Sequence, residues 1–338
     1  MPIQFGIIGC GSIARHRHLP ELSTNKNVKI KAVCDIVASR AEEMAEKYSA
    51  KAYFNYQDLL SDPQIDAVIV CNKNIDHATT TIDALKAGKH VLCEKPMSVS
   101  LEEADEMIRT AKQTNKFLMI GYNQRLFPAH IRAKELLKSK RPGKVLTFRS
   151  AFGHRGCEYW AIDGKDTWFF ERRFVAFGTS ADLAIHKIDL IRWLLDDEVS
   201  EVKTMAETLY KKNGKGEPID VEDTMISLLR MTEGAIGTIT ASWIYAREDN
   251  STTLYCENGI IRLLSDPQYD LIFEMNDGTT EYHNIGGAQT NEKQTDSGVS
   301  ALFVQSILNQ EPPEFSGEEG KASLKVVLDA LESAGYFK

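Results

Sequence analysis

The sequence contains no uninterrupted apolar run long enough to span a bilayer, and its first residues, MPIQFGIIGCG, carry no basic segment ahead of a long apolar stretch. Lysines and arginines number 40 against 48 aspartates and glutamates, which gives a formal net charge of −8. A chain with this balance has no general attraction to nucleic acid or to an anionic membrane surface. We therefore expect a cytoplasmic protein whose partner is a small molecule, with no nucleic-acid and no membrane partner.

The sequence also lacks closely spaced cysteines. Six are scattered along the chain without a CxxC pair: Cys10, Cys34, Cys71, Cys93, Cys157 and Cys256. Metal sites need clustered ligands, and an intracellular chain keeps its thiols reduced. We therefore expect small buried thiols, with no zinc site, no other metal and no disulfide.

At 338 residues the chain exceeds the size at which one hydrophobic core usually stops growing, so two domains are expected. In residues 1–122, apolar runs alternate with amphipathic stretches of helical length, the runs lying at 3–9, 28–35, 66–71, 90–94 and 116–121. Strands that alternate with helices predict an α/β domain with a doubly wound parallel sheet of the Rossmann type.

The second part, residues 123–338, has a different pattern. Helices are expected near 129–139, 180–195, 296–308 and 320–336, with a strand near 144–152 and seven more strand-like runs between 199 and 285. Turn signals such as KNGKG, TEG and NDG separate these runs, which predicts an α+β domain with a large, mostly antiparallel open sheet. Because an open sheet leaves one face bare, we expect a homodimer or homotetramer formed through it.

Glycines mark the end of the first predicted strand. Gly9, Gly11 and Ala14 form G-x-G-x-x-A directly after FGII and directly before a predicted helix, with Ser12 and Ile13 between them. Gly9 permits a tight turn, Gly11 lets the backbone approach a pyrophosphate, and Ala14 allows close packing of helix on strand. The start of the helix offers N–H groups to an anion. This pattern predicts a dinucleotide-binding turn.

An acidic residue, Asp35, closes the second predicted strand about twenty residues beyond Ala14. There a carboxylate can accept hydrogen bonds from the adenosine ribose hydroxyls and repels a 2′-phosphate, so NAD is favoured. Arg40 follows about one helical turn later and softens the preference, so NADP stays possible.

A charged pair, Glu94 and Lys95, stands between the apolar run HVLC and Pro96. Proline keeps the residue before it out of the helical region, so Lys95 is held at a strand end. Open α/β sheets bind ligands at the carboxyl ends of their strands. On this stretch alone, a solvated lysine in a loop is an equally good interpretation.

A second pair, Asp182 and His186, is spaced i, i+4 on the predicted helix 180–195, and Asp189 and Trp193 continue the same face. Taken alone, this spacing fits an acidic first-turn residue plus a core histidine. Together with the glycine turn and Lys95, it favours a catalytic pair.

Four stretches together resemble the glucose–fructose oxidoreductase and inositol dehydrogenase family (Gfo/Idh/MocA): GCGSIA at 9–14, CEKPM at 93–97, GYNQRLFP at 121–128 and DLAIHKID at 182–189. The resemblance implies a Rossmann domain followed by a sheet-rich second domain. It also implies that Lys95 reaches the nicotinamide and the substrate hydroxyl, and that Asp182 and His186 supply the remaining catalytic groups.

The resemblance extends to further contacts. Cofactor contacts are implied for Ser12, Ile13, Asn72, Asn74, His77, Glu94, Lys95, Asn123 and Arg125. Substrate contacts are expected from Arg125 and from four residues of the loop HRGCEYWAIDGKDTWFF: His154, Tyr159, Trp160 and Trp168. A packed aromatic cluster is an equally good interpretation of that loop.

The sequence departs from the family pattern at two places. The family often carries Thr-Pro-Asn-x-x-His after the fourth strand, where this chain has Asn72-Lys73-Asn74-Ile75-Asp76-His77 and so matches at Asn74 and His77 but lacks the proline. Before the predicted catalytic helix a Gly-rich run is reduced to Gly178, and Ala184 replaces a common glycine. The shape of the substrate pocket, and hence the particular sugar, is therefore left open.

The function predicted from these patterns is an NAD(P)-dependent dehydrogenase that oxidises a secondary alcohol of a sugar or cyclic polyol. His186 would act as general base, Lys95 would stabilise the alkoxide, and Asp182 would accept a substrate hydrogen bond. Two alternatives remain: a glycosidase that works through transient oxidation with NAD, and a nucleotide-binding regulator without catalysis. The three intact residues argue against the second.

Overall fold

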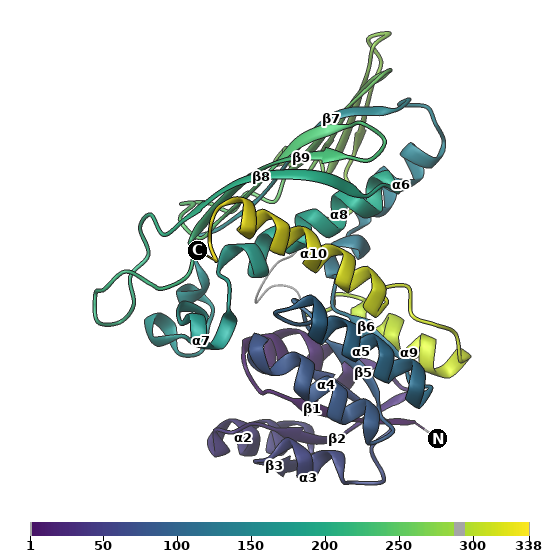
Figure 1. Ribbon diagram of the computed structural model, residues 1–338. Helices are drawn as coiled ribbons and strands as arrows, with labels where there is room; N and C mark the ends of the chain where they lie inside the picture. The colour runs from purple at the N-terminus through teal and green to yellow at the C-terminus, as the bar shows by residue number, and fades with distance from the viewer. Residues whose placement is uncertain (1, 287–294, 338) are drawn as a thin grey trace.

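The computed structural model describes residues 2–286 and 295–337, and two sheets organise it (Figure 1). The N-terminal sheet has six strands: β1 (Ile3–Ile8), β2 (Val28–Cys34), β3 (Lys51–Tyr53), β4 (Ala67–Val70), β5 (His90–Cys93) and β6 (Leu118–Ile120). All pair in parallel in the order β3-β2-β1-β4-β5-β6. The order reverses between β1 and β4, and this reversal places a ligand crevice at the carboxyl ends of these two strands.

The crossovers of this sheet are helical. They contain α1 (Leu19–Thr24), α2 (Ala38–Tyr48), α3 (Tyr56–Leu60), α4 (His77–Lys86) and α5 (Leu101–Thr114). A π-helical turn at Ala14–His18 runs directly into α1. The sequence sets the ends of α5: the Ser100 hydroxyl accepts the Glu103 N–H at its start, and Asn115 takes a left-handed conformation at its end.

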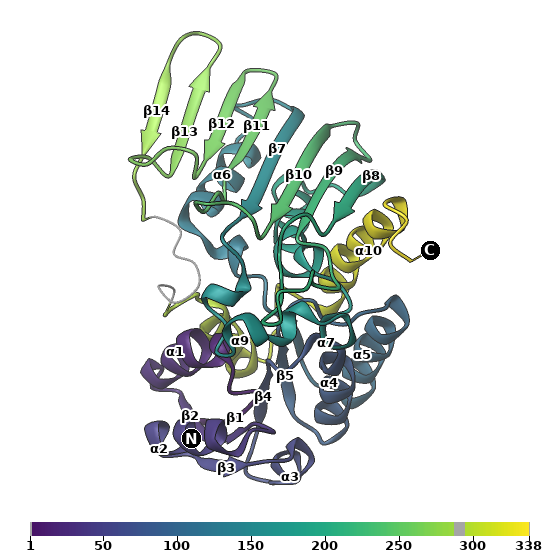
Figure 2. The same ribbon diagram turned by 90° about the vertical axis from the view of Figure 1, so that its left-hand side faces the viewer.

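The second sheet has eight strands: β7 (Val145–Gly153), β8 (Val199–Glu207), β9 (Thr224–Met231), β10 (Ile236–Ser242), β11 (Thr252–Cys256), β12 (Gly259–Leu263), β13 (Leu271–Met275) and β14 (Thr280–His283). Their order is β14-β13-β12-β11-β7-β10-β9-β8, and Figure 2 shows them side by side. β7 and β10 pair in parallel, while the other neighbours are antiparallel. The predicted large, mostly antiparallel sheet is confirmed.

One face of this sheet carries three helices of the second half of the chain. These are α6 (Pro128–Lys138), α8 (Ile185–Leu195), which follows a π-helical turn at Ser180–Ala184, and α10 (Gly317–Ser333), all lying between the sheet and the Rossmann domain (Figure 1). Strand β9 alternates accordingly, because Met225 and Leu229 are buried while Ile226 and Leu228 are exposed. The face that points away from the helices therefore keeps apolar side chains in solvent.

The C-terminal segment returns to the first sheet. Helix α9 (Val299–Asn309) lies beside α1 in Figure 2, and the Phe303 ring packs edge-on against Phe5 of β1 at 6.1 Å between centroids. Ahead of α10, the Ile120 N–H donates to the Phe315 carbonyl at 2.8 Å. The last forty residues thus tie the two sheets together, and the division into domains at Tyr122 stays a prediction.

The predicted α/β class and element order are confirmed, apart from three short elements that were not expected. β3 has three residues, α3 has five and α7 (Arg172–Val175) has four, lengths too short to produce a hydrophobic period. The six cysteines are all buried and unpaired, as expected. In the described part of the chain, no helix combines the length and the apolarity that crossing a bilayer requires.

Candidate active site

A cavity of about 640 Å³ lies at the carboxyl ends of β1, β4 and β5, and segments of the second half of the chain complete its wall. This volume is within the range of small-molecule and cofactor sites. Most of the predicted site residues line it: Gly9, Gly11, Ser12, Ile13, Asp35, Arg40, Asn72, Asn74, His77, Glu94, Lys95, Asn123, His154, Trp160, Trp168, Asp182 and His186. Residues more than 170 positions apart in the sequence therefore share one cavity.

The glycine turn after β1 has the shape that a pyrophosphate needs. Gly9 has φ = +100°, and a Cβ on it would lie 2.4 Å from the carbonyl oxygen of Cys71 at the end of β4. A Cβ on Gly11 would meet no atom within 4 Å, so open space faces this residue. Ala14 is fully buried under the turn and does not line the cavity. The turn therefore fits a dinucleotide, with Ala14 serving helix packing.

The carboxylate of Asp35 is held by backbone on both sides. One oxygen accepts the N–H of Cys10 in the glycine turn and the other accepts the N–H of Val37, both at 2.8 Å. Asp35 therefore has a fixed position at the end of β2, where it lines the cavity and keeps acceptor capacity beyond these two bonds.

Asn72, at the end of β4, offers an unsatisfied acceptor. Its amide nitrogen donates to the Thr80 hydroxyl at 2.9 Å, whereas its Oδ1 is buried without a hydrogen-bond partner among the described residues. Such an atom is costly unless a ligand or water supplies a donor. By contrast, the His77 ring faces two backbone oxygens, those of Pro96 at 2.7 Å and Asn72 at 3.2 Å, so it braces the two strand ends.

Lys95 projects from the end of β5 toward the helix that carries Asp182. Its Nζ donates to the Asp182 backbone oxygen at 2.7 Å and to Oδ1 at 2.9 Å. The preceding Glu94 is buried and accepts from His18 at 2.8 Å. Burial would raise the pKa of Glu94, but the His18 hydrogen bond and the charges of His18 and Arg17 lower it to about 2. The contact of Glu94 with His18 therefore anchors the end of β5, and the Lys95 ammonium next to it binds Asp182.

Asp182 is fixed from a second side by a residue that the sequence did not indicate. The indole N–H of Trp243, just after β10, donates to Asp182 Oδ2 at 2.9 Å. Burial would raise the pKa of Asp182, but the Lys95 charge, His154 and hydrogen bonds from Lys95 and Trp243 hold it below the ordinary value. Asp182 is therefore an ionised acceptor in a buried place.

The start of the helix that carries Asp182 and His186 is also held. The Glu222 carboxylate accepts the Ser180 N–H at 3.0 Å and the Ser180 hydroxyl at 2.5 Å. A Cβ on Gly178 would lie 2.0 Å from the Glu222 carbonyl oxygen, so only glycine fits there. The remaining glycine of the reduced Gly-rich run thus allows the chain to pass close to Glu222.

Two histidines reach the cavity next to Asp182. His154 and His186 both lie about the Phe152 ring, each with a centroid separation of 6.0 Å. Burial, followed by the Lys95 charge, lowers the pKa of His186 well below its usual 6.5, and Asp182 only partly opposes this. Burial also lowers the pKa of His154. Both imidazoles are therefore neutral near pH 7.

The aromatic loop after β7 forms both a packed cluster and a wall of the cavity. Trp168 stacks on Phe169 at 4.0 Å, and Trp160 meets Phe169 edge-on at 5.0 Å. Trp160 and Trp168 nevertheless line the cavity, so the two interpretations of this loop are compatible. Tyr159 does not line it: its side chain is 58% exposed and lies against Arg155. The expected substrate contact of Tyr159 is therefore not supported.

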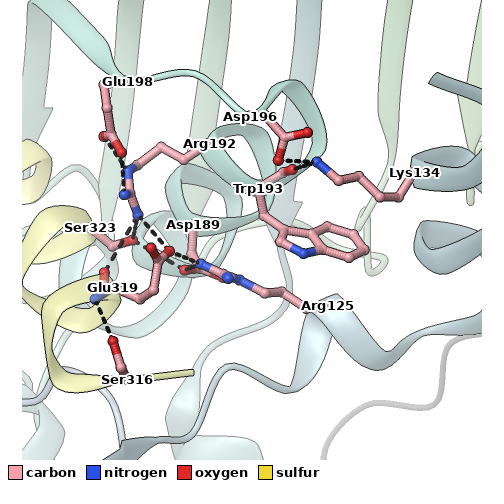
Figure 3. A network of polar contacts seen from close by, with 10 residues as sticks. All are labelled: Arg125, Lys134, Asp189, Arg192, Trp193, Asp196, Glu198, Ser316, Glu319 and Ser323. Carbon is pink, nitrogen blue, oxygen red and sulfur yellow. Dashed lines mark hydrogen bonds and ion pairs between the residues drawn. The ribbon is translucent and has the colours of Figure 1, made fainter. Parts of the chain in front are cut away.

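Arg125 also lies outside the cavity lining, so the cavity gives no support to its expected contacts with cofactor and substrate. Its guanidinium binds both oxygens of Asp189 at 2.5 and 2.7 Å and a Glu319 oxygen at 2.7 Å (Figure 3). Arg192 joins the same network through Ser323 and Glu198. Arg125 is 3% exposed and its donors are used internally, so it links α8 to α10.

Sequence reasoning therefore missed three side chains that shape the site: Trp243, Glu222 and Asp163. The Asp163 carboxylate accepts from Arg40 at 2.5 Å, and both residues line the cavity. Each of the three acts on a partner at least 42 positions away. No local pattern marks such a partner.

Comparison with known proteins follows the two sheets. Residues 3–122 match the oxidoreductase family described as having an NAD-binding Rossmann fold, and residues 130–262 match the GFO/IDH/MocA C-terminal domain. Myo-inositol 2-dehydrogenase of Thermotoga maritima is 29% identical over 98% of this chain and 96% of its own length.

Solved structures show the same arrangement. Levoglucosan dehydrogenase in complex with NADH and levoglucosan superposes with a TM-score of 0.88 at 22% identity, over 100% of this chain and 98% of that one. Scyllo-inositol dehydrogenase of Lactobacillus casei with bound NAD(H) and scyllo-inositol gives 0.82 at 21% identity, over 100% and 98%. At these identities the likeness concerns the fold. Together with the two matched domains, it shows that the chain belongs to the Gfo/Idh/MocA family of oxidoreductases, with an NAD-binding Rossmann domain.

Proposed function

We propose that this protein is an NAD-dependent dehydrogenase that interconverts a secondary alcohol of a sugar or cyclic polyol and the corresponding ketone. One observation carries the proposal. Lys95, Asp182 and His186 come from two halves of the chain and meet in the cavity that also contains the glycine turn and Asp35. A dinucleotide cradle and a buried set of acid, base and cation within one cavity suit hydride transfer better than simple binding.

NAD, when bound, supplies the acceptor for the hydride that leaves the alcohol carbon. The residues that would hold it are Gly9, Gly11, Asp35 and Asn72. The backbone near Gly11 leaves room for the pyrophosphate, and the helix beginning at Ser12 directs N–H groups toward it. Asp35 would accept hydrogen bonds from the ribose hydroxyls, and the unpartnered Asn72 Oδ1 would accept one from the cofactor.

His186 is the proposed general base for the hydroxyl proton. Its lowered pKa keeps the imidazole neutral at physiological pH, the state in which it can accept a proton. Lys95 would stabilise the negative charge that develops on the oxygen, since its ammonium lines the same cavity as His186. Asp182, held ionised by Lys95 and Trp243, would accept a hydrogen bond from a substrate hydroxyl and so orient the ring.

A polyhydroxylated ring suits the rest of the wall. His154 accepts the Gly156 N–H at its Nδ1, so the neutral ring carries its proton on Nε2 and can donate to a hydroxyl oxygen. Trp160 and Trp168 add aromatic surface on the same wall. The relatives named above act on inositols or levoglucosan, which are compounds of this class.

A turnover screen tests the proposal. The purified protein is incubated with NAD and myo-inositol, scyllo-inositol, levoglucosan or a series of aldoses, and NADH is followed by absorbance. We expect stoichiometric NADH and ketone from at least one compound. Release of free sugar from a glycoside without net NADH would instead identify a glycosidase, and NADH binding without turnover of any compound would identify a regulator.

We also propose that the second sheet forms a homo-oligomer interface. Its face away from the helices exposes Met205, Ile226, Leu228 and Ile236 on the adjacent strands β8, β9 and β10, with Met205 74% exposed. Monomeric proteins seldom leave such a patch uncovered. Ile226→Arg should shift the protein to monomer in size-exclusion chromatography with light scattering, whereas an unchanged mass would contradict this interface.

A cytoplasmic location is proposed as well. Six buried thiols stand unpaired in the described structure, which suits a reducing compartment. Fractionation of the source cells tests this placement.

A further inference from the structure

The loop around Asp163, in the second half of the chain, contacts Arg40 in the part of the cavity that also contains Asp35. Because Asp35 would bind the adenosine ribose, we call this part the adenosine end. Arg40, in the first turn of α2, donates from its terminal nitrogen to Asp163 Oδ1 at 2.5 Å, although the two residues are 123 positions apart. Both line the cavity, and their side chains are 23% and 35% exposed. The pair therefore lies at the cavity wall, one helical turn beyond Asp35.

The position of Asp163 is fixed by more than this one contact. Three residues earlier, the Trp160 carbonyl accepts the Ser12 hydroxyl at 2.9 Å, which joins the loop to the glycine turn. The Trp160 ring packs against Phe169, and the Ala161 carbonyl accepts the Gly164 N–H at 3.1 Å. These contacts hold the loop against the glycine turn and place Asp163 beside Arg40.

Arg40 is the residue that would otherwise recognise a 2′-phosphate. An arginine soon after the second strand accommodates this group in proteins that use NADP, because a guanidinium forms two charge-assisted hydrogen bonds to a phosphate. Here Asp163 already occupies one terminal nitrogen. With Asp35 beside it, the adenosine end presents two carboxylates against one guanidinium.

We propose that Asp163 is a coenzyme-specificity residue, which excludes NADP by holding Arg40 away from a 2′-phosphate. The inference rests on the proposed NAD-dependent function and extends it. Discrimination against the phosphate is divided between Asp35, which lies on the Rossmann sheet, and Asp163, which lies in the loop of the other half. Asp163 acts through Arg40 and through its own charge, and it takes no part in the reaction.

The effect of Asp163 on cofactor choice can be measured without a large change in the stability of the fold. A partly exposed ion pair contributes only about 0–1 kcal/mol to folding, so an isosteric change of Asp163 to asparagine should leave the protein folded. The same change frees the Arg40 guanidinium to bind a 2′-phosphate. It also removes the negative charge of Asp163, which would repel that phosphate. The expected effect therefore falls on the binding of NADPH and spares that of NADH.

The test measures Kd for NADH and NADPH by nucleotide fluorescence, which needs no substrate. Asp163→Asn should tighten NADPH about tenfold while NADH changes by less than about twofold, since only NADPH gains an arginine–phosphate contact. The double variant Asp163→Asn/Arg40→Ala should lose that gain. Glu43→Gln is the matched control, because Glu43 pairs with Arg15 on the same domain without touching Arg40.

Other results would overturn the inference. If Asp163→Asn weakens both nucleotides equally, the pair only holds the loop in place. If the double variant keeps the gain, or Glu43→Gln produces the same gain, Arg40 is not the recognition group. If the unaltered protein binds NADPH as well as NADH, no discrimination exists to explain. A failure to bind either nucleotide would overturn the proposed function together with this inference, and so differs from all of these.

Discussion

The two ends of the cavity hold their charged groups in opposite ways. At the end proposed to hold the substrate, called the reacting end, Lys95 and Asp182 are largely buried, and each oxygen of Asp182 has a fixed donor. At the adenosine end, Arg40 and Asp163 meet in partial contact with solvent. Breaking a buried pair leaves an uncompensated charge, whereas water screens an exposed one. Substitutions at the buried end should therefore change turnover, and those at the exposed end should change which cofactor is chosen.

The largest effect is expected from Lys95→Met. The variant loses the cation that stabilises a developing alkoxide, so kcat should fall about 10³-fold while Kd for NADH stays within about threefold. Steady-state kinetics and NADH fluorescence measure the two quantities. Lys73→Met is the matched control, since it removes another cavity-lining ammonium, one that lies over the Phe174 ring. An equal loss in both variants would attribute the effect to net charge, and an unaltered kcat would place Lys95 outside the reaction.

His186→Asn should come next, with a loss of about 10²-fold or more in kcat/KM for alcohol oxidation. The pH profile gives the sharper test. Only neutral imidazole accepts the proton, so the rate should fall as pH drops through the pKa of His186. Burial lowers that pKa below 6.5, so the decline should lie on the acidic side of 6.5 and the rate should be level just above it.

The control for this prediction is His154→Asn, which removes the other cavity imidazole and should keep the acidic limb. Lys95 is the competing base. If Lys95 accepts the proton, Lys95→Met should erase the limb, whereas a His186 limb should survive at reduced amplitude. An acidic limb that persists unchanged in His186→Asn would show that His186 is a packing residue.

Asp189→Asn tests whether the Arg125–Asp189 pair, which lies outside the cavity lining, is structural. The amide would place a donor against the Arg125 guanidinium in a pair that is buried on both sides (Figure 3), so we expect a loss of about 3 kcal/mol in unfolding free energy. Urea denaturation measures this loss. The folded variant should bind NADH as the unaltered protein does. A stable variant with weakened NADH binding would return Arg125 to the cofactor site.

Many of the residues that line the cavity were predictable because they mark the ends of elements. Gly9, Gly11 and Lys95 follow apolar runs that pair in parallel, and carboxyl ends of parallel strands lie along one edge. Asp182 and His186 share a helix face that the i, i+4 spacing alone indicates. The fold was predictable for the same reason, since run length and turn residues are local signals.

Partners across the fold could not be predicted in this way. Arg125 stands in a motif that resembles a site motif, yet its carboxylates come from 64 and 194 positions further on. Trp243 reaches Asp182 over 61 positions. Apart from residue type, a sequence gives no sign of which distant group satisfies a buried donor. An arginine that pairs within a structural network therefore cannot be distinguished by sequence from one that binds a ligand.

Trp243→Phe measures the hydrogen bond that sequence reasoning missed. Phenylalanine keeps the aromatic packing but removes the donor to Asp182 Oδ2, so Asp182 should orient substrate less well and kcat/KM should fall about tenfold. The pKa of Asp182 should rise, since one bond to its ionised form is lost. Trp168→Phe, which alters a cavity tryptophan stacked on Phe169, is the control and should have the smaller effect. Equal rates for Trp243→Phe and the unaltered enzyme would contradict the role of this bond.

The smallest effect is expected from Asp35→Ala at the exposed end. Removing this carboxylate abolishes repulsion of a 2′-phosphate, yet Arg40 stays paired with Asp163, so NADPH affinity should rise by only about threefold. NADH affinity should fall, because Asp35 also fixes the Cys10 and Val37 N–H groups beside the glycine turn. The ratio of kcat/KM with NAD to kcat/KM with NADP should therefore decrease, because one affinity falls while the other rises.

The same substitution in an Asp163→Asn background tests the coupling of the two carboxylates. With Arg40 released, Asp35→Ala should increase NADPH affinity by more than it does alone, as expected of groups that share one partner. Strict additivity of the two changes would mean that Asp35 and Asp163 act on the phosphate independently of Arg40, and equal use of NAD and NADP by the unaltered enzyme would remove the contrast between the two ends.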